Sequence, residues 1–200
     1  DWDDLVHPWD FAADRLPPSL QAGQRIITEA DFVPAQNAYG GFVYAGATMA
    51  FTTAYWALHA LKPRTIAFLG CDMVYDTPAQ THFYGNGTPD PLRPDITLQS
   101  LEAKSARLRI FAARQDCALV NLSSGKTRLA LPRADRNSLP THPIDYDRRL
   151  ATLADLQEAA LGYYSPTGRY WEELDRFDPA SLAALDDMWL RAGSHPMIAA

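Results

Sequence analysis

The sequence lacks the features of a membrane-spanning or a general nucleic-acid-binding protein. No apolar run approaches the roughly 18 residues that a transmembrane helix needs. The chain carries 18 Lys and Arg against 24 Asp and Glu, so its net charge is −6. Proteins that bind nucleic acid or anionic membranes present a basic face. We therefore expect neither partner, although a local basic pocket remains compatible with this balance.

Cysteine is scarce, with only Cys71 and Cys117. Cys71 follows one predicted strand and Cys117 precedes another. If those strands are parallel neighbours, the two residues lie at opposite ends, about 16 Å apart at roughly 3.3 Å per residue. A disulfide needs Cα atoms within about 7 Å. We expect two free thiols, a reducing compartment and a cytoplasmic location.

Several catalytic motifs are also missing. The chain has no Cys-x-x-Cys and no His-Glu-x-x-His, which argues against a structural or protease-type zinc site. It has no Gly-x-x-x-x-Gly-Lys-Ser/Thr loop for nucleotide phosphates and no Gly-x-Ser-x-Gly nucleophile turn. We expect the protein to bind no metal and no cofactor, so that its small-molecule ligands are its substrates.

What is present is an alternation of apolar strands and helices. The chain is 47% hydrophobic, enough for a core without disulfides. Strands are predicted at 25–29, 65–70 and 118–123, with helices at 47–61 and 97–115. This order is typical of an α/β protein with an open parallel sheet and flanking helices. We expect a Rossmann-like fold, either complete or with part of its sheet missing.

The rest of the chain divides into loops and a helical end. Residues 34–46 are glycine-rich and predict a loop with a short strand at 42–44, and residues 127–131 predict an edge strand. We expect two regions: an α/β domain over 1–144 with an irregular N-terminal arm, and a helical extension over 145–200 packed on it. Helices in this extension are predicted at 146–161, 166–175 and 179–192. Its exposed side offers a surface for a homodimer.

Polar residues crowd the end of the strand in 66-IAFLGCDMVYDTPAQTHFYGNG-87. Ligands of open parallel sheets bind beyond the carboxyl ends of the strands. His82 is the candidate general base or acid, because imidazole titrates near neutral pH. Its alternative role is a loop histidine bonded to the backbone. Asp72 could orient His82, hold a substrate hydroxyl or bind a metal, or it could cap the turn after the strand.

Other candidates surround this pair. Tyr75 and Tyr84 could donate hydrogen bonds to a phosphate or a sugar, or pack with exposed polar tips. Gly46 and Thr48 in 44-YAGATMA-50 stand before a helix, whose free N–H groups could bind an anion. On the next strand Asn121 and Ser123 reach the same rim, where Lys126 and Arg128 add positive charge. The alternative for this last group is a polar turn.

The order of these pieces resembles the second half of bacterial sialyltransferases of the Campylobacter type and of related uncharacterised surface-polysaccharide proteins. The matching pieces are 45-AGATMAFTTAYWALHALKPRTIAFLGCDMVY-75, 82-HFYG-85, and the helix and strand through 121-NLSS-124. They cover about 80 of the 200 residues. The family's Gly-Asn-Gly turn has no match upstream of residue 45, and residues 145–200 have no counterpart.

The resemblance implies an inverting, metal-independent transfer of a sugar from a CMP-linked donor to the hydroxyl of a glycan acceptor, in surface-glycan synthesis. It implies that His82 deprotonates the acceptor and that Tyr75 steadies the departing phosphate, with Tyr84 as a nearby candidate. Two alternatives stay open. One is a metal-assisted hydrolase or phosphotransferase using Asp72 and His82. The other is a sugar- or nucleotide-binding module without catalysis.

Overall fold

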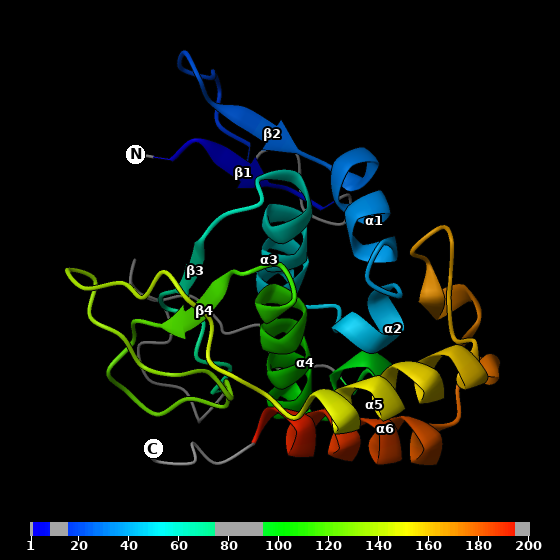
Figure 1. Ribbon diagram of the computed structural model, residues 1–200. Coiled ribbons are helices and arrows are strands. Elements are labelled where there is room, and N and C mark those ends of the chain that lie inside the picture. Colours follow the sequence, from blue (N-terminus) through cyan, green and yellow to red (C-terminus); the bar gives the residue numbers. More distant parts are fainter. Residues whose placement is uncertain (1, 9–15, 75–93, 195–200) are drawn as a thin grey trace, which may run out of the picture.

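A computed structural model describes residues 2–8, 16–74 and 94–194 of the chain (Figure 1). Its strands form two separate parallel pairs, β1 (Asp4–Val6) with β2 (Arg25–Ile27) and β3 (Thr65–Phe68) with β4 (Ala118–Asn121). The fold is therefore mixed α/β with parallel pairing, as predicted. The described strands do not join into one open sheet.

The β3–β4 pair is flanked by two helices that precede its strands. In Figure 1 the chain ascends through α3 (Met49–Ala60), descends through β3, ascends through α4 (Leu101–Ala113) and descends through β4. Thr65 lies opposite Ala118 in the strand register. Both helices thus run antiparallel to the strands. Their N-termini therefore lie toward the same end of the pair as the carboxyl ends of β3 and β4.

Helix α3 confirms the predicted buried helix at 47–61. The Thr48 hydroxyl caps its start by accepting from the Phe51 N–H at 3.2 Å. Phe51, Tyr55 and Leu58 are fully buried, because the helix is apolar nearly all round.

Three local predictions are wrong. Residues 34–46 form no strand: α1 (Glu29–Asn37) continues through Pro34, and α2 (Phe42–Ala45) follows. A capping box at Thr28 starts α1, with the Thr28 N–H donating to Asp31 at 2.9 Å.

Residues 127–131 form no edge strand. In place of a helix at 166–175 there are two short 3₁₀ turns, η3 (Tyr170–Glu172) and η4 (Leu174–Arg176).

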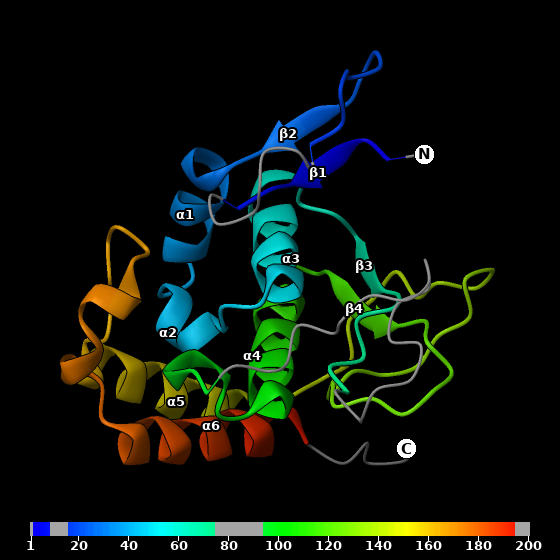
Figure 2. The ribbon, with the colours of Figure 1, turned by 180° about the vertical axis from the view of Figure 1, so that it is seen from behind.

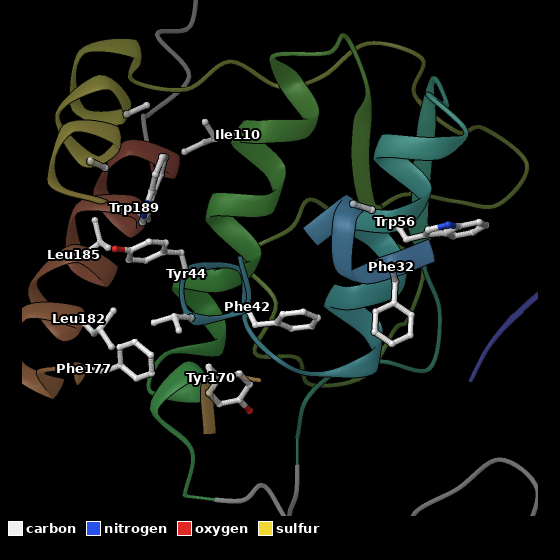
Figure 3. Close-up of a cluster of buried hydrophobic side chains, with 14 of the residues drawn as sticks. Phe32, Phe42, Tyr44, Trp56, Ile110, Tyr170, Phe177, Leu182, Leu185 and Trp189 are labelled. Carbon is white, nitrogen blue, oxygen red and sulfur yellow. The ribbon is translucent and has the colours of Figure 1, made fainter. Parts of the chain in front are cut away.

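The C-terminal helices lie against α4. Helices α5 (Arg148–Leu161) and α6 (Pro179–Gly193) run side by side, and both views show them below α4 (Figures 1 and 2). Asp147 and Asp178 cap their starts. One buried cluster joins these helices to α1, α2 and α4 (Figure 3); its labelled members include Phe42, Tyr44, Ile110, Leu182, Leu185 and Trp189.

A second buried cluster lies between the strand pair and helices α3 and α4. It contains Phe51, Leu108 and Leu119, and Phe111 packs against both clusters. Helix α4 is therefore covered on nearly every side, where the sequence predicted a single apolar stripe. Even Lys104 is 1% exposed, and its ammonium donates to Asp186 on α6 at 2.8 Å.

Cys71 and Cys117 are free thiols, as the sequence predicts. The described helices include none with both the length and the apolar character needed to cross a bilayer.

Candidate functional site

A polar cluster lies where β3 and β4 end, and an unusual turn builds it. Gly70 has φ +72° and Met73 has φ +55°. A residue other than glycine rarely adopts a positive φ, which costs on the order of 1–3 kcal/mol. Met73 is buried in the same cluster as Phe51 and Leu98, and this packing holds the turn. The turn points the intervening Asp72 toward β4.

Asp72 is bonded to the end of the neighbouring strand. The Asn121 amide donates to Asp72 Oδ1 at 3.0 Å and also to Thr127 Oγ1 at 3.1 Å. Asn121 Oδ1 in turn accepts from the Ser123 N–H at 2.8 Å, and Asn121 is 1% exposed. The loop after β4 closes over the same residue, since the Arg128 N–H donates to the Asp72 carbonyl at 2.9 Å. Asn121 is thus fixed in one orientation and positions the carboxylate.

A cation stands beside the carboxylate. Arg133 Nη1 lies 3.9 Å from Asp72 Oδ1, and the same guanidinium donates to the carbonyl oxygens of Ser123 and Gly125. Burial opposes ionisation of Asp72, but the hydrogen bonds from Asn121, Ser123 and Thr127 outweigh it, with help from the charge of Arg133. The pKa of Asp72 therefore lies below its usual value.

These facts limit what Asp72 can do. A carboxylate with a lowered pKa is ionised at neutral pH, so it accepts hydrogen bonds and cannot donate a proton. It is also a weak base. Because 23% of its side chain is exposed, a ligand can reach it. The geometry suits a group that holds a hydroxyl or orients an imidazole.

The predicted base and phenols lie outside the described residues. His82, Tyr75 and Tyr84 all fall within 75–93. The described chain leaves the cluster at Val74 and resumes at Pro94. That Asp72 and His82 converge on one pocket therefore stays a prediction.

Gly46 and Thr48 have structural contacts. Gly46 has φ +87°, and an added Cβ would stand 3.0 Å from the Phe51 ring and 3.1 Å from Lys104 Cγ. The Thr48 hydroxyl caps α3, and the neighbouring Ala47 N–H donates to Thr97 Oγ1 at 3.1 Å. The N–H groups of Ala47 and Phe51 at this helix start are thus already bonded within the protein. Among the described contacts, none links either residue to Asp72.

Sequence reasoning placed Asn121 and Ser123 at this rim but missed Thr127 and Arg133. It singled out Arg128 for positive charge, and that side chain instead pairs with Glu102 on α4 at 2.7 and 3.0 Å. Arg133 reaches the site because its backbone bridges to Asn121, 12 residues earlier. No local pattern in the sequence signals this bridge.

The described part of the chain contains no group of three His, Cys, Asp or Glu side chains arranged to hold a metal. Comparison with protein-family models, with curated proteins and with solved structures finds no match to the chain. The fold and the site together define a mixed α/β protein. Its distinguishing feature is an ionised Asp72, bonded to Asn121, at the carboxyl end of a parallel strand pair.

Proposed function

We propose that this protein is a glycosyltransferase-like enzyme that binds a nucleotide sugar where β3 and β4 end. In this proposal the strand pair is the centre of an open, Rossmann-like parallel sheet. The supporting observation is the hydrogen bond from Asn121 to Asp72, because it joins polar groups from two adjacent parallel strands at their carboxyl ends, where α/β sheets bind ligands. The resemblance to sialyltransferase-like proteins supplies the reaction.

The proposed reaction transfers a sugar from a CMP-linked donor to the hydroxyl of a glycan acceptor. The acceptor oxygen attacks the anomeric carbon while His82 takes its proton. The bond between that carbon and the phosphate oxygen breaks, and the nucleotide leaves with the electron pair, which inverts the configuration. The step needs no metal.

Asp72 contributes by position. As an ionised acceptor it can hold the acceptor hydroxyl or the imidazole N–H of His82 in line for proton transfer. Tyr75 and Tyr84 donate to the phosphate as charge grows on it. Arg133, whose side chain is 40% exposed, adds a positive charge beside the same rim. The proposed role is in surface-glycan synthesis in the cytoplasm.

A transfer assay with matched histidine variants tests this function. His82→Ala should abolish transfer from a CMP-linked sugar while the thermal unfolding temperature stays the same. His142→Ala is the control, because its side chain is 84% exposed and should be dispensable. Sugar transfer by purified His82→Ala protein at the wild-type rate would exclude His82 as the general base.

Two further measurements separate the alternatives. EDTA should leave transfer unchanged; loss of activity that a divalent ion restores would favour a metal-assisted hydrolase or phosphotransferase. A thermal-shift screen with CMP, CDP, UDP and free sugars should show stabilisation by CMP. Stabilisation by a nucleotide without turnover of its sugar conjugate would favour a binding module.

A further inference from the structure

The outer edge of β4 is paired over only part of its length. The N–H groups of Ala118 and Leu122 donate to backbone carbonyls at the two ends of β3, so the even-numbered residues bond with that strand. Because pairing groups alternate along a strand, the N–H and C=O groups of Leu119 and Asn121 point to the other edge. Asn121 is paired there, since it bridges to Arg133 in the loop after β4.

Pro132 explains why this pairing stops before Leu119. At the bridge, the Asn121 N–H donates to the Pro132 carbonyl at 2.9 Å, and the Ala134 N–H donates to the Asn121 carbonyl at 3.2 Å. The next rung of this parallel ladder would run from the N–H of residue 132 to the Leu119 carbonyl. Proline has no N–H, so the rung cannot form. The backbone hydrogen bonds of the described residues include none from the outward groups of Leu119.

A cavity of about 230 Å³ lies at this unpaired part of the edge. Leu119 lines it with its backbone, because its side chain packs into the second buried cluster, against α3 and α4. The side chains of Ala118 and Val120 alternate with that of Leu119 and therefore face the cavity. All three residues are at most 2% exposed. The apolar wall is completed by Pro132, Pro140 and Ile144.

The chemistry of this cavity defines what fits it. Its walls are apolar, whereas its edge offers one N–H donor and one carbonyl acceptor from the same residue. More than about 90% of buried backbone groups are paired, so a ligand held here has to pair with both. A ligand does so when an acceptor stands beside a donor on the rim of a flat ring. We propose that the cavity binds a planar heterocycle with an amide or amidine edge, which is the chemistry of a nucleobase.

The size and place of the cavity limit the ligand further. Pockets for larger ligands measure roughly 300–1,000 Å³, so this one has room for a single ring system. Leu119 lies toward the amino end of β4, whereas Asp72 is bonded to Asn121 at the carboxyl end. The inference does not rest on the proposed function. A nucleoside carries neither a phosphate nor a transferable sugar, so its binding can be measured apart from sugar transfer.

Uridine and 3-methyluridine are matched probes for this site. Uridine presents an N–H between two carbonyl oxygens, and methylation at that nitrogen removes the donor while keeping the ring. In an NMR titration, uridine should shift the amide resonance of Leu119 and slow its exchange. We expect 3-methyluridine to bind roughly tenfold more weakly, because the buried Leu119 carbonyl stays unpaired. Equal affinity for both, or an unchanged Leu119 resonance at saturating uridine because water alone fills the cavity, would overturn the proposal.

A proline variant tests the same site from the protein side. Pro132→Ala supplies the missing donor, so its N–H should complete the next rung to Leu119 and abolish uridine binding. The amide at position 132 should then exchange slowly, which an unfolded variant would not show. Pro18→Ala is the control, because Pro18 is exposed and lies before β2, and it should bind uridine as the wild type does. Wild-type affinity for uridine in Pro132→Ala would contradict the proposal.

Discussion

Arg107 on α4 and Glu158 on α5 form a bidentate ion pair inside the protein, with N–O distances of 2.6 and 2.7 Å. The arginine side chain is 1% exposed and the glutamate side chain 10%. Arg107 also donates to the Tyr55 hydroxyl at 2.7 Å, and the Trp189 indole donates to Glu158 at 2.8 Å. Burial disfavours the charge of Arg107, but Glu158 and Tyr55 raise its pKa overall. The pair therefore connects α3, α4, α5 and α6.

Glu158→Gln should destabilise the fold strongly, because it leaves the buried Arg107 charge without a counter-ion. Breaking such a pair from one side costs about 3–5 kcal/mol. Asp155→Asn is the control on the same helix: its partner is Arg114, and the two side chains are 39% and 28% exposed, so its loss should cost less than about 1 kcal/mol. Urea unfolding measures both. Equal losses of unfolding free energy for the two variants would show that the Arg107–Glu158 pair stabilises the fold no more than an exposed ion pair does.

Asp72 should make stability depend on pH in the acid range. Its pKa is lower in the folded chain than the ordinary value of 3.8. Its contribution is therefore complete above the unfolded pKa and is lost as pH falls through the folded value. The difference in unfolding temperature between wild type and Asp72→Asn should be constant near neutral pH and shrink below pH 3.8. A difference that grows with acid would refute this assignment.

The two thiols should differ in reactivity. Cys117 is 1% exposed, and burial raises its pKa to about 11. Cys71 is only half-buried, and burial raises its pKa as well, followed by the charge of Asp72. Because the thiolate is the reactive form, a thiol reagent should modify Cys71 slowly and Cys117 only after unfolding. Labelling of Cys71→Ser should thus require urea. Rapid labelling of that variant without urea would show that Cys117 is accessible.

The sequence predicts those parts of the fold whose signals are local. Helix α3 and strands β3 and β4 are continuous apolar runs between turn residues, and they form where expected. Helix α1 was missed because Pro34 and the following glycines suggest a loop, although Thr28 and Asp31 already supply its cap. A short helix with a good cap can continue through a proline at the loss of one hydrogen bond.

Long-range partners explain what sequence reasoning could not find. Lys104 and Arg107 look like the solvent face of an ordinary amphipathic helix. They are buried because Asp186 and Glu158 from the C-terminal helices neutralise them. At the candidate site, Asn121 was predictable because it ends the neighbouring strand. Arg133 was not, since it arrives through a backbone bridge after a loop.

The central claim is that ligands bind at the polar cluster around Asp72. A titration of the isotope-labelled chain with CMP, followed through backbone amide resonances, tests it most directly. The account predicts concentration-dependent shifts at Gly70, Asp72 and Ser123, with none at the exposed Leu156 on α5. Saturating CMP that leaves the first three resonances unchanged, or that shifts only residues of the C-terminal helices, would contradict it.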